Sequence, residues 1–134
     1  MDTGIWRRAL QRLQSRPLRN LPHISWTMVH RMRAVRFCGN TIRQSKEPYV
    51  ILLNNDTEVF PDFVERLYEG ICKRKNAFAC SAKLISYQER DKIDDAGNYY
   101  NMLGWAFARG KGKPVSEFET SDRIFAACAG AAIY

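Results

Sequence analysis

The strongest indication of the fold is the segment YVILLNNDTEV, residues 49–59. Four consecutive apolar residues, 50–53, run directly into Asn54, Asn55 and Asp56 with no turn residue between them. A short, continuous apolar run of this kind predicts a strand buried on both faces, as in a parallel sheet. Ligands of open α/β sheets bind beyond the carboxyl ends of such strands. The sequence therefore places Asp56 where a fold of this class carries out its chemistry.

The polar residues after this run suit one kind of ligand. A carboxylate with side-chain amides beside it fits a hard divalent cation that carries a diphosphate. Mg²⁺ keeps much of its water and is typically held by one or two carboxylates together with substrate phosphates. The alternative is a strand-to-helix turn in some other α/β protein, in which the Asn and Asp side chains only cap.

The longer stretch YVILLNNDTEVFPDFVERL resembles the metal-binding segment of family 2 glycosyltransferases with a GT-A fold. It is especially similar to the branch that includes rhamnosyltransferase-like, cell-wall and O-antigen enzymes. In that family the strand ends in a D-x-D or N-x-D element, whose last Asp holds the cation bound to the nucleotide-sugar diphosphate. The resemblance gives this metal role to Asp56, with Mg²⁺ or Mn²⁺ as the cofactor. It places Asn54 and Asn55 with Asp56 in the donor-binding site.

Three further segments carry the resemblance. The segment DDAGNYYNMLGWAFAR resembles the family's Q-x-A-G-G stretch through Gly97. The last segment, IFAACAGAAIY, resembles the strand written V-x-x-x-S-G-A-A. The resemblance therefore implies that Gly97, Gly130 and Ala131 line the cleft for the sugar and the acceptor. Residues 38–40 match a Gly-Asn turn, after which Ile42 is expected to pack inward.

The expected fold is α/β. It is an incomplete GT-A domain, the Rossmann-like fold of nucleotide-diphospho-sugar transferases, with a mostly parallel sheet flanked by helices over residues 37–134. Within it a helix is expected to open at Pro61 and Asp62 and to end at Asn76, because proline fits the first helical turn. Residues 77–85 are expected to form another buried strand.

Residues 1–36 form a separate basic segment of uncertain origin. The net charge is +7 over 134 residues, yet residues 1–46 carry nine Arg and one Lys against a single acid. Apolar residues at helical spacing predict a short amphipathic helix near the start, and residues 24–37 a second helical stretch. Three explanations stay open: a segment that rests on an anionic membrane, a nucleic-acid-binding arm or targeting peptide, and the product of a truncated or out-of-frame gene.

Other polar and aromatic residues are assigned structural roles. Asp94 and Asp95 are adjacent, so in a strand they point to opposite faces and cannot act as a catalytic pair; both are expected to be surface or turn acids. Residues 109–114 lack the strand and helix that flank a P-loop, which predicts a mobile charged loop. Three aromatic residues are assigned to cross-strand packing rather than to stacking on sugars: Tyr99, Tyr100 and Trp105. The four cysteines are expected to be reduced and mostly buried.

The function implied by the resemblance is inverting transfer of a sugar from a nucleotide diphospho-sugar to an acceptor hydroxyl. The acceptor is a saccharide or a lipid-linked molecule in bacterial-type cell-surface polysaccharide or glycolipid synthesis. In the family the general base is an Asp in an E-D motif, expected beyond Tyr134, so no catalytic residue is assigned and the chain is expected to be a fragment that is inactive alone. The expected location is cytoplasmic, with peripheral contact at the inner face of a membrane and no nucleic-acid partner. The alternative function is a small basic protein that binds nucleic acid or anionic membranes.

Overall fold

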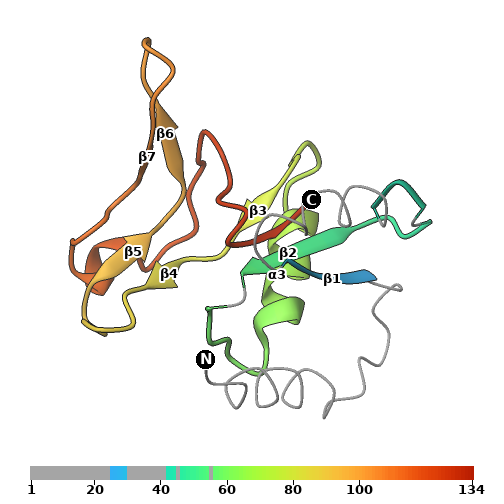
Figure 1. Ribbon diagram of the computed structural model, residues 1–134, viewed down its shortest axis with the longest axis horizontal. Coiled ribbons are helices and arrows are strands. Elements are labelled where there is room, and N and C mark those ends of the chain that lie inside the picture. The colour runs from blue at the N-terminus through green and yellow to red at the C-terminus, as the bar shows by residue number, and fades with distance from the viewer. Residues whose placement is uncertain (1–24, 30–41, 45, 55) are drawn as a thin grey trace.

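The computed structural model describes residues 25–29, 42–44, 46–54 and 56–134, and within 25–29 it describes the backbone alone. Its main sheet has four strands in the order β1–β2–β8–β3 (Figure 1). Their bounds are Ser25–Val29 for β1, Val50–Asn54 for β2, Ala131–Ile133 for β8 and Cys80–Ser81 for β3. Strand β1 is parallel to β2, whereas β8 is antiparallel to both β2 and β3. Strands β1, β2 and β3 therefore run in one direction and β8 runs in the other.

Strand β2 confirms the strand predicted for residues 50–53. Ile51 is only 1% exposed, while the other apolar side chains of β2 are half-buried. The expectation of complete burial on both faces is therefore wrong, because β2 has its fully buried side chain only on the face covered by a helix. The helical stretch predicted for residues 24–37 is also wrong over residues 25–29, where the backbone forms β1.

The predicted helix is confirmed as α3, Phe63–Cys72. It follows Pro61 and Asp62, and the Arg66 backbone N–H donates to the Asp62 carbonyl over 2.9 Å. The Arg66 side chain also pairs with the Asp62 carboxylate over 3.1 Å. One face of α3 packs on the sheet, and the buried core there consists of Ile51, Val64, Leu67, Ile71 and Ile133. Burial of these side chains supplies the main hydrophobic stabilisation of the sheet.

The predicted fold class, a mostly parallel sheet flanked by helices, is wrong. Among the described residues only the β1–β2 pairing is parallel, and the other four strand pairings are antiparallel. The chain between β3 and β8 contains short strands, turns and one 3₁₀ turn in place of crossover helices. Glycines at positive φ, among them Gly97, Gly104 and Gly110, permit the tight turns that this antiparallel arrangement needs.

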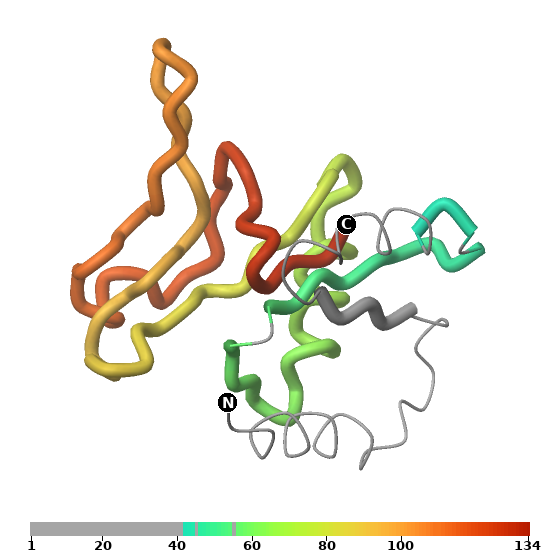
Figure 2. Tube along the Cα trace, viewed as in Figure 1, coloured from blue at the N-terminus to red at the C-terminus, as the bar shows by residue number. Residues whose placement is uncertain are grey.

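Residues 84–126 form a lobe beside the sheet (Figure 2). The chain leaves the sheet after β3, passes through the lobe and returns to the sheet at β8. The lobe contains β4 (Leu84–Ile85), β5 (Ile93–Asp95), β6 (Asn98–Tyr100), β7 (Ala106–Ala108) and the 3₁₀ turn η1 (Val115–Phe118). Strands β4 and β5 pair with each other, as do β6 and β7. The strand predicted for residues 77–85 is thus divided between the sheet and the lobe, with Ala82 and Lys83 at the break.

The basic loop 109–114 is held by ion pairs within the lobe. Lys111 pairs with Asp94 over 3.0 Å, Lys113 with Glu117 over 3.1 Å, and Arg109 with Asp122 over 2.6 Å. Its backbone is tied to β5, because the Gly112 N–H donates to the Ile93 carbonyl and the Ile93 N–H to the Lys113 carbonyl. No α-helix follows it, since η1 is a four-residue 3₁₀ turn. The prediction of a charged loop is confirmed, whereas its predicted mobility is not, because these ion pairs and hydrogen bonds tie the loop to the rest of the lobe.

Two other expectations about packing are wrong. Ile42 is 39% exposed rather than packed inward. Cys72 is an exposed thiol, whereas Cys80 and Cys128 are half-buried; none of these three forms a disulfide.

The predicted helix near the chain start and the turn at residues 38–40 lie outside the described residues. Within the described part of the chain, no helix has the length and apolar character needed to cross a membrane.

Candidate functional site at the end of β2

The candidate site begins at the carboxyl end of β2. Asn54 is the last residue of the strand and is exposed, and Asp56 is exposed in the turn that follows. The Thr57 hydroxyl donates to the Asn54 carbonyl over 2.7 Å, which closes this turn. Asn55, the other predicted donor-binding residue, lies outside the described residues. The two polar side chains that the structure describes here are therefore presented to solvent beyond the sheet, as the sequence predicts.

Gly130 and Ala131 lie directly beside this strand end. The Asn54 N–H donates to the Gly130 carbonyl over 2.8 Å, and Ala131 pairs with Leu53 in the sheet. A methyl group on Gly130 would lie 3.5 Å from the Asn54 side-chain amide nitrogen and 3.4 Å from the Cys128 sulfur. Gly130 is itself buried, and the Asn54 amide lies at ordinary packing distance from the place of the missing methyl group. Ala131 is 1% exposed, so it shapes the sheet and offers no side chain to a ligand.

Gly97, the third predicted cleft residue, serves a different purpose in the structure. It links β5 to β6 with φ of +108°, a conformation that L side chains rarely adopt. A methyl group at Gly97 would lie 2.6 Å from Cγ2 of Ile124, which is closer than packed carbon atoms approach. Gly97 is thus required by the backbone and by the approach of Ile124.

Asp95 is a buried carboxylate that the sequence interpretation missed. It is only 7% exposed, so its assignment as a surface or turn acid is wrong. Its Oδ1 accepts the Gly97 N–H over 2.5 Å, and the Cys128 thiol donates to the same carboxylate. Burial raises the pKa of Asp95, and the hydrogen bonds from Gly97 and Cys128 oppose this rise. The contact between Asp95 and Cys128 joins β5 to the segment just before Gly130.

The expected opposite orientation of the two adjacent acids is confirmed. Asp94 pairs with Lys111, whereas Asp95 faces the interior and contacts Cys128. The strand geometry that separates them is the reason they cannot act on one substrate atom together. No signal in the local sequence distinguishes the buried acid from the exposed one, because the burial of Asp95 depends on residues far along the chain.

An ion pair connects the strand-end turn to the lobe. Arg90 donates to the Glu58 carboxylate over 3.3 Å, and the Arg90 guanidinium also lies over the Tyr87 ring at 4.4 Å from its centre. Glu58 is two residues beyond Asp56, so this pair fixes the polar turn against the loop between β4 and β5. Sequence reasoning assigned neither side chain, because nothing local indicates that these two segments meet.

The residues present fit a cation only together with its ligand. Within the described ranges no group of three or more His, Cys, Asp or Glu side chains is placed to hold a metal ion. Asp56 supplies a single exposed carboxylate with the Asn54 amide nearby in sequence. One carboxylate is enough for Mg²⁺ when substrate phosphates and water complete its coordination. The arrangement therefore suits a cation that arrives with a diphosphate.

Comparisons with protein-family models, with curated proteins and with solved structures find no match to this chain.

Proposed function

We propose that the polar end of β2 binds the diphosphate of a nucleotide sugar together with Mg²⁺ or Mn²⁺, as part of an inverting glycosyl transfer to an acceptor hydroxyl. The observation that carries the proposal is the meeting of Asn54 with Gly130 beside the exposed Asp56. Gly130 lies far from Asn54 and Asp56 in the sequence. They meet at a strand end, where Gly130 is buried and the Asn54 side chain is exposed.

Each residue of the proposed site has a distinct part. Asp56 would hold the cation, and the Asn54 amide would donate a hydrogen bond to a phosphate oxygen. When bound, the cation neutralises charge that develops on the departing diphosphate. Asp95 is no candidate for the general base, because its carboxylate is buried and already accepts hydrogen bonds from Gly97 and Cys128. The acceptor is a saccharide or a lipid-linked molecule.

The proposed location follows from the proposed substrates. We infer that the chain acts in the cytoplasm, in peripheral contact with the inner face of a membrane, where a soluble donor and a lipid-linked acceptor would meet. No nucleic-acid partner is part of this proposal.

Ligand titrations test the proposal against its alternative. Binding of UDP, GDP and dTDP to the whole chain is measured by equilibrium dialysis, with and without Mg²⁺. We expect binding of at least one nucleotide that requires the metal and is lost in Asp56→Ala. A basic nucleic-acid- or membrane-binding protein would instead bind DNA or anionic vesicles, with an affinity that falls steeply with salt and is unchanged by Asp56→Ala. That result would overturn the proposal.

A further inference from the structure

The hairpin β6–β7 is an uncharged, apolar projection of the lobe. Residues 96–108 contain no Asp, Glu, Lys or Arg. The hairpin extends away from the rest of the chain (Figure 1). Its turn carries Met102 and Leu103, which are 102% and 82% exposed. Two adjacent apolar side chains at the end of such a projection form a surface that water solvates poorly.

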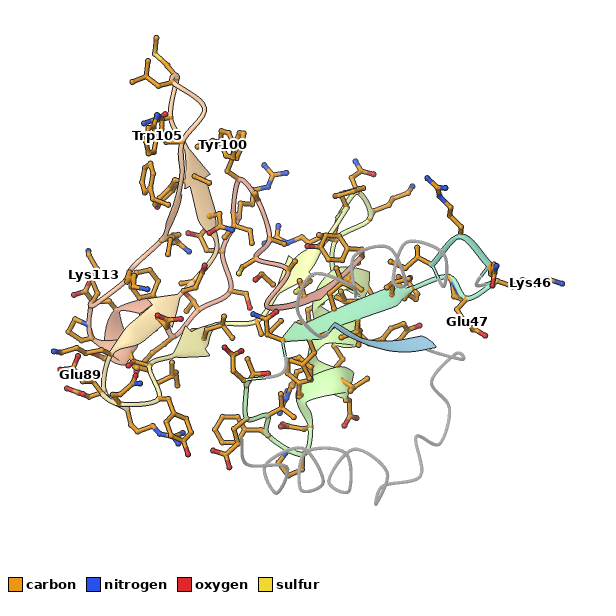
Figure 3. The ribbon with its side chains drawn as sticks, viewed as in Figure 1. Lys46, Glu47, Glu89, Tyr100, Trp105 and Lys113 are labelled. Atoms are coloured by element: carbon orange, nitrogen blue, oxygen red, sulfur yellow. The ribbon has the colours of Figure 1, made fainter. Side chains whose placement is uncertain are left out.

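Aromatic rings cover both sides of this hairpin. Tyr99 pairs with Phe107 across the strands, with ring centres 5.6 Å apart. On the other side Tyr100 packs against Phe125 at 6.0 Å. Tyr100 and Trp105 project to opposite sides of the hairpin (Figure 3). The predicted cross-strand packing is thus observed for Tyr99. Trp105 remains 69% exposed.

The turn at the end of the hairpin is firmly built. The Asn101 Oδ1 accepts the backbone N–H groups of Leu103 and Trp105, each over 3.0 Å. The Asn101 N–H donates to the Trp105 carbonyl, and Gly104 adopts φ of +83°. Met102 and Leu103 are therefore held outward by a hydrogen-bonded turn, so their exposure is a property of the hairpin's own structure.

We propose that the end of the β6–β7 hairpin inserts into the interfacial region of a lipid bilayer. Apolar groups on both sides and at the end can be covered together only by a medium that surrounds the hairpin. A second copy would cover one side: Tyr99, Trp105 and Phe107 are 44%, 69% and 51% exposed. That side offers roughly 350 Å², given ~150–250 Å² for each aromatic side chain. A standard protein interface buries about 800 Å² per partner.

The order of residues along the hairpin fits the depth of a membrane interface. At about 3.3 Å per strand residue, Trp105 lies roughly 7 Å from the end at Leu103, and Arg109 roughly 20 Å. Interfacial segments bury their apolar side about 5–10 Å deep, and Trp and Tyr favour the headgroup level. The hairpin can therefore insert its end and leave every charged residue in water. This inference rests on the hairpin alone and is independent of the diphosphate site.

Vesicle flotation of the whole chain tests the inference. Uncharged phosphatidylcholine vesicles are used, so that the basic residues 1–46 gain no electrostatic attraction. We expect the chain to float with the vesicles, and the double variant Met102→Ser, Leu103→Ser to lose about a hundredfold in partition coefficient, from the apolar transfer of two side chains. Both side chains are exposed, so circular dichroism should show an unchanged fold.

The matched control is Phe60→Ser, Phe78→Ser, which removes apolar side chains that are 73% and 86% exposed elsewhere on the chain. This control should bind vesicles like the unmodified chain. An equal loss in the control would overturn the inference, as would failure of the unmodified chain to float. Retention of the chain on a polysaccharide column that survives Met102→Ser, Leu103→Ser, with no vesicle binding, would assign the aromatic rings to sugar stacking instead.

Discussion

Replacing Gly97 by Ala distinguishes a structural glycine from one that lines a sugar cleft. Gly97 has φ of +108°, and the added methyl group would lie 2.6 Å from Cγ2 and 2.9 Å from Cβ of Ile124. Gly104 is the matched control, because its φ is +83° and nothing lies within 4 Å of an added methyl group. The two substitutions share the backbone cost, and only Gly97→Ala adds a clash.

The expected magnitudes follow from these two terms. An L residue in the left-handed region costs about 1–2 kcal/mol. Forcing an extra methyl group into a packed contact costs about 1–3 kcal/mol more. We therefore expect Gly97→Ala to lower the free energy of unfolding by about 2–5 kcal/mol, and Gly104→Ala by about 1–2 kcal/mol. Since domains of this size have only ~5–15 kcal/mol of stability, the larger loss is readily measured.

Urea unfolding followed by circular dichroism measures both free energies. A second substitution tests the cause, because Ile124→Ala removes two of the three atoms that the new methyl group would meet, Cγ2 at 2.6 Å and Cδ1 at 3.2 Å, and leaves only the Cβ contact at 2.9 Å. The double variant Gly97→Ala, Ile124→Ala should be more stable than the sum of the single losses predicts, by about 0.5–3 kcal/mol. Equal losses for Gly97→Ala and Gly104→Ala would show that a methyl group at Gly97 meets no clash with Ile124. A cleft-lining role predicts instead weakened ligand binding with little change in stability.

Two further predictions concern buried groups. Burial raises the pKa of Asp95 from its ordinary value of 3.8, so the protonated carboxyl stabilises the fold at low pH and this contribution is lost as pH rises through the folded-state pKa. The free energy of unfolding of Asp95→Asn, relative to that of the unmodified chain, should therefore increase as pH rises from the ordinary pKa to the folded-state pKa of Asp95. Urea unfolding at several pH values measures this difference. A difference that stays constant with pH would contradict the prediction. Ile133 is 0% exposed in the core. Replacing it by Ala should lower the free energy of unfolding by about 2–5 kcal/mol, and replacing it by Val should lower it by about 0.5–1.5 kcal/mol. Thermal unfolding compares the two variants, and indistinguishable losses would place Ile133 outside the core.

The parts of the fold that the sequence predicts are those set by local pattern. Strand β2 is specified by its continuous apolar run, and α3 by Pro61, Asp62 and the helical spacing of its apolar residues. The site residues Asn54 and Asp56 follow β2 directly, so their position beyond the strand end could be predicted with it. Their exposure confirms that part of the prediction.

The remainder depends on pairing between distant segments. The direction of β8 is set by its hydrogen bonds to β2 and β3, and its own small residues suit either direction. The resemblance predicted a parallel sheet with crossover helices, whereas residues 84–126 form short antiparallel strands. Gly97, Gly104 and Gly110 adopt positive φ in the turns of this segment, and Gly104 lies in the turn of the β6–β7 hairpin. A glycine in a sequence does not reveal whether it serves a ligand or a turn.

The buried acid and the strand-end ion pair were missed for the same physical reason. Asp95 is buried because Cys128 and the Gly97 N–H satisfy its carboxylate, and a single sequence does not show which distant residues meet. Arg90 and Glu58 likewise come from separate loops. Polar contacts of this kind are decided by tertiary structure.

Calorimetric titration of the chain with a nucleoside diphosphate and Mg²⁺ tests the proposed site at the end of β2. The comparison is between Asp56→Asn, which removes the proposed metal ligand, and Asp91→Asn, which removes an exposed carboxylate from the loop between β4 and β5. A metal–diphosphate site at Asp56 predicts metal-dependent binding to the unmodified chain and to Asp91→Asn, and its loss in Asp56→Asn. Binding that Asp56→Asn retains in full, or that needs no metal, would show that Asp56 holds no cation for a diphosphate.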